Sequence, residues 1–176
     1  MENWKRPKTE VNALMKLLVS SLEKELPTLI KNDIKLSAIG QIESLDSKSK
    51  TKLSEVINKT KDCKKLNLTL AISYGSRQEL VNTFKSISNK VKNNTISIEN
   101  IDEKIINEHL YSRNLPDVDL LIRTGGEYRI SNFLLWQIAY AELYFSDVLW
   151  PDFKKEDFYK AIIDYQKRER RFGKIS

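Results

Sequence analysis

Short apolar runs alternate along the chain with segments in which apolar residues recur every three or four positions. The apolar runs predict strands at residues 34–39, 66–72, 118–122 and 141–145. The periodic segments predict helices at residues 7–26, 47–62, 77–92, 101–110 and 155–170. Strands alternating with helices indicate an α/β fold, a mainly parallel sheet flanked by helices.

Prolines, glycines and polar clusters set the expected boundaries of these elements. Pro27 is expected to end or interrupt the first helix, and Gly40 to turn the chain after the first strand. Residues 93–98 read as a loop. Residues 134–139 are apolar and are expected to begin a further short helix.

Polar turns follow three of the predicted strands, after Ile39, Ile72 and Ile122. The carboxyl ends of parallel strands meet at one edge of a sheet, where ligands collect. After Ile122 come Arg123, a Thr-Gly-Gly turn, Arg129 and Ser131. Glycines allow close approach of the backbone, and a guanidinium group can donate hydrogen bonds to two phosphate oxygens at once. The pattern favours an anion site; the alternative is a polar turn whose arginines face water.

Length and composition are those of an ordinary globular protein. At 176 residues, with 40% hydrophobic and 31% charged residues, the chain is expected to form a single domain spanning 1–176. The net charge of +6 comes from 30 basic residues interleaved with 24 acidic ones, so a nucleic-acid partner is not expected. One cysteine, Cys63, suits a reducing compartment. With no apolar leader and no run of roughly 18 apolar residues, the chain is expected to be cytoplasmic.

The sequence lacks the residues that several classes of chemistry require. The Gly125-Gly126 turn fits neither dinucleotide-binding nor Walker-type motifs. One cysteine and one histidine, His109, cannot build a zinc cluster, and His109 is expected at the surface of a polar helix. No nucleophile elbow of a serine hydrolase is present. Arginines, hydroxyls and carboxylates remain, a set that suits diphosphates with a hard cation such as Mg²⁺.

Six segments together resemble the cis-prenyltransferases, most closely the bacterial undecaprenyl diphosphate synthases, also called isoprenyl transferases. The segments are residues 3–7 (NWKRP), 74–77 (YGSR), 119–127 (DLLIRTGGE), 129–137 (RISNFLLWQ), 142–145 (ELYF) and 168–173 (RERRFG). They follow the order of the family and span nearly the whole chain. The long stretch at residues 123–137 is specific enough to make chance a poor explanation.

The resemblance implies a reaction and a set of site residues. The family condenses isopentenyl diphosphate with an allylic diphosphate, usually farnesyl diphosphate, with Mg²⁺ as cofactor. The product is a long cis-polyprenyl carrier lipid for cell-wall synthesis, here expected to be undecaprenyl diphosphate. The implied roles, by motif position, are catalysis by Asn3, substrate binding by Trp4, Arg6, Arg123, Arg129 and Ser131, and support of Mg²⁺ by Glu142.

The resemblance also implies an assembly and a product tunnel. Family members are homodimers, and the tail residues Arg171 and Gly173 are expected to reach the partner's active site. A growing polyprenyl chain needs a tunnel with apolar walls. The family lines it at positions that correspond to Leu14, Leu17, Leu18, Ile34 and Leu66. Transient contact with the inner face of a membrane is a further expectation.

The family pattern also contains a loop of the form DGNGRW, whose aspartate holds Mg²⁺, and this loop is not found in the 176 residues. The domain is therefore expected to be N-terminally incomplete, without the first strands and the helix between them, and inactive on its own. Three explanations stay open: a fragment of an ordinary synthase, one half of a split enzyme, or a non-catalytic partner subunit. The rival from another class is a basic anion-binding module.

Overall fold

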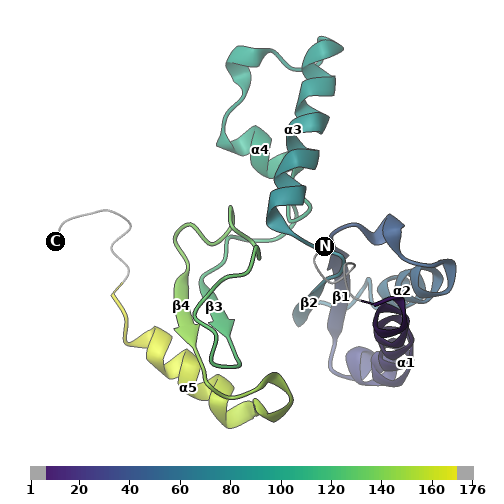
Figure 1. Cartoon of the computed structure of the whole chain (residues 1–176), viewed down its shortest axis with the longest axis vertical. Helices are drawn as coiled ribbons and strands as arrows, with labels where there is room; N and C mark the ends of the chain where they lie inside the picture. The colour runs from purple at the N-terminus through teal and green to yellow at the C-terminus, as the bar shows by residue number, and fades with distance from the viewer. Residues whose placement is uncertain (1–6, 170–176) are drawn as a thin grey trace. The chain divides into compact units, whose positions relative to one another are not determined.

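The computed structural model describes residues 7–169 of the chain. Its contacts divide the chain into two compact units, Met1–Arg113 and Asn114–Ser176, which are described in turn (Figure 1). The expectation of a single domain stays a prediction. Asn3, Trp4, Arg6, Arg171 and Gly173 lie outside the described residues.

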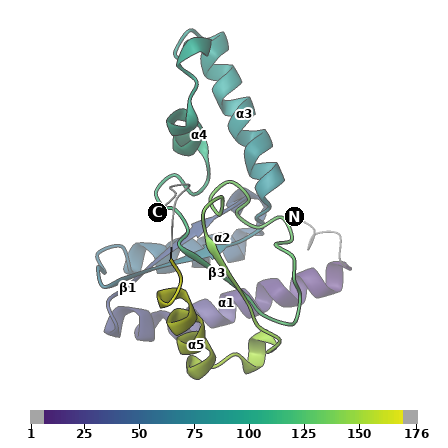
Figure 2. The same ribbon diagram turned by 90° about the vertical axis from the view of Figure 1, so that its left-hand side faces the viewer.

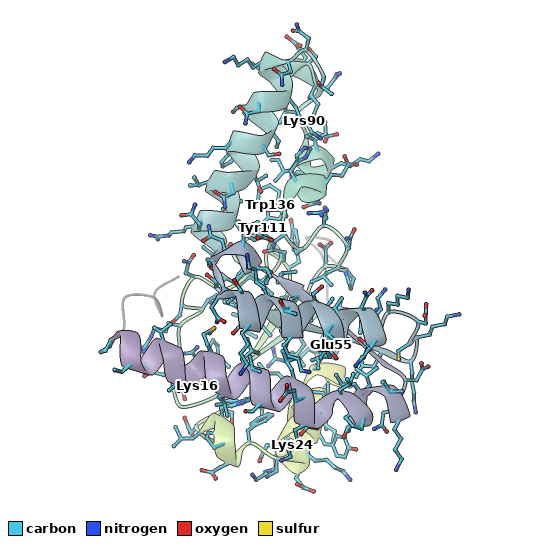
Figure 3. The ribbon with its side chains drawn as sticks, turned by 90° about the vertical axis from the view of Figure 1, so that its right-hand side faces the viewer. Lys16, Lys24, Glu55, Lys90, Tyr111 and Trp136 are labelled. Carbon is cyan, nitrogen blue, oxygen red and sulfur yellow. The ribbon has the colours of Figure 1, made fainter. Side chains whose placement is uncertain are left out.

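The first unit is built on a pair of parallel strands, β1 (Ile34–Ile39) and β2 (Leu66–Ala71). Ile34 pairs with Leu66 and Ile39 with Ala71, so the two strands end together. The helices α1 (Lys8–Lys31) and α2 (Ser47–Lys59) lie side by side, as Figure 3 shows, and a short 3-10 helix, η2 (Ile42–Ser44), precedes α2. This arrangement confirms both predicted strands and the helix between them.

The core of the first unit forms where α1 and α2 meet β1. Its buried members are Leu22, Leu29, Leu36, Leu45, Leu53 and Val56. These side chains come from four separate segments, and burying each contributes about 1.5–3 kcal/mol relative to exposure. Packing, more than intrinsic propensity, therefore holds these elements together.

Pro27 does not end the first helix, and that expectation was wrong. α1 continues through Pro27 to Lys31. A proline inside a helix removes a backbone donor and costs about 3 kcal/mol. Beyond it, Leu29 is 7% exposed and belongs to the core, and the side chain of Pro27 itself faces solvent. The last turn continues because ending the helix at Leu26 would withdraw Leu29 from the core.

The rest of the first unit is a pair of helices, α3 (Ser76–Lys92) and α4 (Glu103–His109), joined through η3 (Ile98–Asn100). Figure 2 shows α4 beside α3. Glu79 of α3 is fully buried; its carboxylate accepts hydrogen bonds from the Tyr74 hydroxyl at 2.5 Å and the Tyr111 backbone at 2.8 Å. Tyr111 lies at the base of α3 (Figure 3). Glu79 thus joins the turn after β2 to the segment after α4.

The second unit contains a parallel pair, β3 (Leu120–Arg123) and β4 (Glu142–Phe145), the short helix η4 (Trp150–Asp152) and the helix α5 (Lys155–Gln166). Leu120 pairs with Glu142, and Arg123 pairs with Phe145. Both predicted strands are confirmed. α5 ends at Gln166, earlier than the pattern indicated.

The short helix expected at residues 134–139 does not form. Ser131, Asn132 and Leu134 all have positive φ angles, of 52°, 62° and 49°. These left-handed conformations are incompatible with a right-handed helix. The segment is a series of turns, in which the Ile138 N–H donates to the Leu134 carbonyl at 3.0 Å and the Ala141 N–H to the Ile138 carbonyl at 3.0 Å.

Across residues 7–169, none of the helices combines the length and the apolar character that crossing a bilayer requires.

Candidate functional site

The turn that follows β3 is fixed by backbone hydrogen bonds to the loop that follows β4. The Ser146 N–H donates to the Arg123 carbonyl at 2.8 Å. The N–H groups of Gly125 and Gly126 donate to the carbonyls of Val148 and Ser146, at 2.9 and 3.0 Å. Both glycines have positive φ, 88° and 68°, which explains why this turn carries glycine. The carboxyl end of the strand pair is therefore a rigid edge with Arg123 on it.

Two arginines give this edge its positive charge. The Nε atom of Arg123 is buried and has no hydrogen-bond partner among the described residues. A buried donor without a hydrogen bond is rare, because leaving the hydrogen bond unmade costs about 1–3 kcal/mol. Such a donor therefore indicates a binding partner. Arg129 is different: its side chain is 63% exposed and forms an ion pair with Glu127. Such an exposed pair is weak enough for a diphosphate to displace.

Ser131 lies in a strained stretch of backbone. Three residues in four, Ser131, Asn132 and Leu134, adopt the left-handed region, which costs about 1–3 kcal/mol each for residues with a Cβ. Such strain persists only where the surroundings determine it, and it clusters at binding sites. Gln137 and Ile138, both 8% exposed, anchor the stretch, and the Val118 N–H donates to the Gln137 carbonyl at 3.4 Å.

Asp147 and Tyr128 are site residues that sequence reasoning missed. The Tyr128 hydroxyl donates to Asp147 Oδ1 at 3.3 Å, and its ring lies 5.3 Å from that of Phe145. A Cβ on Gly126 would lie 3.5 Å from the same Oδ1. Asp147 is thus the carboxylate beside the glycine turn. Its place two residues after the predicted strand at 141–145 was a signal that could have identified it.

Glu142 lies at the opposite end of the strand pair from the glycine turn. It pairs with Leu120, three residues before Arg123 in the register, which corresponds to about 10 Å along a strand. Its Oε2 accepts a hydrogen bond from Arg168 Nη1 at 2.9 Å. The Glu142 hydrogen bond, and then Asp164, raises the pKa of Arg168 further above its usual value, against the effect of burial.

The expected Mg²⁺ site can be compared with the carboxylates of the described residues. Within residues 7–169, histidine, cysteine, aspartate and glutamate side chains form no group of three that could hold a metal ion. Glu142 already neutralises a guanidinium group. Mg²⁺ is commonly held by one or two carboxylates together with substrate phosphates, so a group of three is not required. The metal role of Glu142 stays a prediction.

The five predicted tunnel residues belong to the first unit and fall into two groups. Leu18 and Ile34 are half-buried and pack against the core, whereas Leu14, Leu17 and Leu66 are 38%, 61% and 56% exposed. The same unit has an open groove of about 690 Å³, whose lining is mixed. It consists of the apolar Ala38, Ile42, Leu53 and Ile57 and the polar or charged Glu43, Lys50, Thr51, Ser54, Glu55 and Asn58. The tunnel role of the five residues is not tested by these positions and stays a prediction.

The cysteine and the histidine offer little for catalysis. Cys63 is free and half-buried, and desolvation raises the pKa of its thiol, which makes it a poor nucleophile at neutral pH. His109 is also half-buried and not at the surface as expected. Its Nδ1 lies 2.7 Å from the Ile105 carbonyl, so the ring is held against its own helix.

The fold and the site define an α/β protein with an arginine-bearing loop at the carboxyl edge of a parallel strand pair. A family model described as "putative undecaprenyl diphosphate synthase" matches residues 1–173, and the chain belongs to this family. By family it is an isoprenyl, or cis-prenyl, transferase.

Individual relatives agree with this membership. The chain is 47% identical to the isoprenyl transferase of Chlorobaculum tepidum over 176 residues, all of this chain and 66% of the relative. It is 48% identical to a farnesyl-diphosphate-specific ditrans,polycis-undecaprenyl-diphosphate synthase of Pasteurella multocida, covering 98% of this chain and 72% of the relative. The chain thus spans about two thirds of the length of these relatives.

Solved structures show the same fold. A probable undecaprenyl diphosphate synthase from Campylobacter jejuni is 41% identical, with a TM-score of 0.85 over 98% of this chain and 79% of that one. Lavandulyl diphosphate synthase from Lavandula x intermedia, in complex with dimethylallyl diphosphate, is 34% identical, with a TM-score of 0.94 over 98% of this chain and 75% of that one. These likenesses confirm the fold class expected from the sequence.

Proposed function

We propose that this chain supplies the isopentenyl diphosphate site of a cis-prenyltransferase. The reaction condenses isopentenyl diphosphate with farnesyl diphosphate, repeatedly, to a long cis-polyprenyl diphosphate, undecaprenyl diphosphate. Support comes from the family and from the name of the Pasteurella multocida relative, which specifies farnesyl diphosphate. The proposed reaction also uses Mg²⁺, whose charge offsets that of the diphosphates. Glu142 is proposed to support it, by the family motif alone.

The observation that carries the proposal is the buried, unpartnered Nε of Arg123 beside a glycine turn fixed at the end of β3. A diphosphate oxygen is a strong acceptor that would satisfy this donor. Arg129 can exchange its exposed pairing with Glu127 for a second phosphate oxygen, and Ser131 can donate its hydroxyl. These groups would orient and neutralise the substrate. Asn3, Trp4 and Arg6 are proposed to lie near the reacting ends, by the family motif alone.

Calorimetric titration of the 176-residue chain with isopentenyl diphosphate tests the proposal. We expect Arg123→Ala to weaken binding at least about tenfold, the effect of losing one charge-assisted contact, while thermal unfolding changes little. Arg113→Ala is the matched control, because Arg113 is exposed and its replacement removes the same charge. Equal losses in both variants, with affinity falling steeply with salt, would support the basic anion-binding module instead.

The chain by itself is proposed to lack condensation activity, since it spans about two thirds of its relatives and lacks the DGNGRW loop. The purified chain is incubated with farnesyl diphosphate, labelled isopentenyl diphosphate and Mg²⁺. Long butanol-extractable product would refute this. Activity restored by adding a polypeptide that carries the DGNGRW loop would favour the split-enzyme explanation, and binding without restored activity the non-catalytic subunit.

We also propose that the protein acts as a homodimer in the cytoplasm, in transient contact with the inner membrane surface. The basic tail with Arg171 and Gly173 would then complete the partner's site, and Leu14, Leu17, Leu18, Ile34 and Leu66 would contact the growing chain. Sedimentation equilibrium, with and without isopentenyl diphosphate, tests the assembly. A monomer under both conditions would contradict it.

A further inference from the structure

Arg168 lies between two carboxylates of the second unit. Its Nη1 donates to Glu142 Oε2 at 2.9 Å and to the Leu143 carbonyl at 2.9 Å, and its Nη2 donates to Asp164 Oδ2 at 2.5 Å. The guanidinium side chain is 31% exposed, and the side chains of Glu142 and Asp164 are 27% and 46% exposed. We call these three residues the Arg168 clamp.

The clamp joins elements that are far apart in the sequence. Glu142 and Leu143 begin β4, whereas Asp164 lies in the last turn of α5 and Arg168 just beyond it. Partly buried, charge-assisted and multiply bonded pairs are stronger than ordinary surface ion pairs. The clamp therefore fixes the end of α5 to the first residues of β4.

The pairing of two strands connects the clamp with the anion site. β4 is paired along its length with β3, which ends in Arg123. A displaced α5 end would therefore move β4 and, through this pairing, change the position of Arg123.

We propose that Arg168 is a positioning residue of the diphosphate site and that Glu142 acts through it. In this view Glu142 contributes by holding Arg168, with or without a bound metal ion. The proposal rests on the proposed function for its effect on isopentenyl diphosphate. It assigns to Glu142 a role that its side-chain contacts support.

A double-mutant cycle tests the proposal in the 176-residue chain, with isopentenyl diphosphate binding measured by calorimetry. Glu142→Gln, Arg168→Gln and Asp164→Asn are each expected to weaken binding about threefold to tenfold, as loss of a partly exposed charged contact does. The double variant Glu142→Gln/Arg168→Gln is expected to bind no more weakly than Arg168→Gln alone. Additive losses, or no effect of Asp164→Asn, would overturn the proposal.

The response to metal separates the two roles of Glu142. If Glu142 acts through Arg168, the loss in Glu142→Gln persists when the titration is repeated in a chelator. If Glu142 contacts the metal, the loss disappears without Mg²⁺. That second result would overturn the proposal. Arg168→Lys, which keeps the charge but lacks the forked geometry, is expected to restore part of the binding.

Hydrogen exchange provides a readout that needs no ligand. The N–H groups of Lys167 and Arg168 donate to the carbonyls of Asp164 and Tyr165, so their exchange reports the end of α5. Glu142→Gln is expected to accelerate this exchange. Lys160→Gln is the control, because it removes the ion pair between an exposed lysine and Asp157 in the first turn of the same helix. Unchanged exchange in Glu142→Gln would overturn the clamp. Absence of binding by the unaltered chain would overturn the proposed function, whatever the exchange shows.

Discussion

The backbone at Gly40 lies directly against the carbonyl of Ile72. A Cβ placed on residue 40 would come within 2.1 Å of that oxygen, and the φ angle of Gly40 is 111°. The contact joins the carboxyl ends of β1 and β2, and the N–H of Gln41 donates to the Ser73 carbonyl at 3.4 Å beside it. No other residue type fits at position 40 unless one of the two backbone segments, at residue 40 or at residue 72, moves.

Gly40→Ala is expected to lower the free energy of unfolding by at least about 2 kcal/mol, because strain and a backbone clash act together. Gly125→Ala is the control: its φ is 88°, but the nearest atom to the added Cβ is 3.8 Å away. It is expected to cost about 1–2 kcal/mol from backbone strain alone. Urea denaturation measures both, and a Gly40→Ala variant as stable as Gly125→Ala would contradict the close approach.

Thr60 connects the end of α2 to β1 through one hydroxyl group. It donates to the Val56 carbonyl at 2.9 Å and accepts the Leu36 N–H at 3.0 Å, and the side chain is fully buried. Thr60→Val leaves the Leu36 N–H unsatisfied and is expected to destabilise by about 1–3 kcal/mol in urea denaturation. Thr60→Ser keeps the hydroxyl and is expected to lose less. The opposite order would argue against the hydrogen bond.

The buried carboxylate of Glu79 predicts a measurable effect of one phenolic oxygen. Tyr74→Phe removes the hydroxyl that donates to Glu79 Oε2 and is expected to cost about 1–3 kcal/mol, because it removes a hydrogen bond to a fully buried carboxyl group. Tyr159→Phe serves for comparison, since Tyr159 is 51% exposed on α5. Calorimetric melting of both variants checks this, and equal melting temperatures would rule out a stabilising role for the bond.

The helix cap of α2 predicts a dependence of stability on acid. Asp46 accepts hydrogen bonds from the Ser49 hydroxyl and N–H, at 2.6 and 3.0 Å, and these hold the pKa of its carboxyl below the usual 3.8. A lowered folded pKa stabilises the protein above the unfolded pKa, and this stabilisation is lost as the pH falls through the folded value.

Asp46→Ala is therefore expected to lower the melting temperature by a few degrees at pH 7. Asp46→Asn keeps an acceptor for the Ser49 N–H and is expected to show a smaller loss, without the added acid sensitivity below pH 3.8. Thermal melts at pH 7 and near pH 3 measure both effects. A gap between the unaltered chain and Asp46→Asn that does not narrow in acid would contradict the assignment.

Local pattern predicted most of the fold because most elements bury one regular face. Strand β1, with Leu36 and Ile39 buried, and helix α2, with Leu53 and Val56 buried, follow directly from apolar spacing. The last turn of α1 could not be predicted, because the tertiary burial of Leu29 outweighs the local effect of Pro27.

The candidate site was predictable in part for a similar reason. Arg123 and the glycine turn lie next to each other in sequence, so motif and geometry coincide. The contact between Glu142 and Arg168 could not be predicted in this way. The two residues are 26 positions apart, and sequence spacing gives no sign of their contact. The left-handed residues at Ser131, Asn132 and Leu134 were also hidden, because serine and leucine rarely adopt this conformation.

The connection between β3 and β4, residues 124–141, has a consequence for the evolution of this chain. Parallel strands need a long crossover, which is usually a helix whose outer face tolerates change. Here the crossover is itself the loop that carries Arg129 and Ser131. Backbone hydrogen bonds hold its start to the segment after β4 and Gln137, near its end, to the segment before β3. An insertion or deletion in it would shift the strand pairing, Arg129 and Ser131 together. Surface loops ordinarily vary in length, but this one is expected to keep its length wherever both strands are kept.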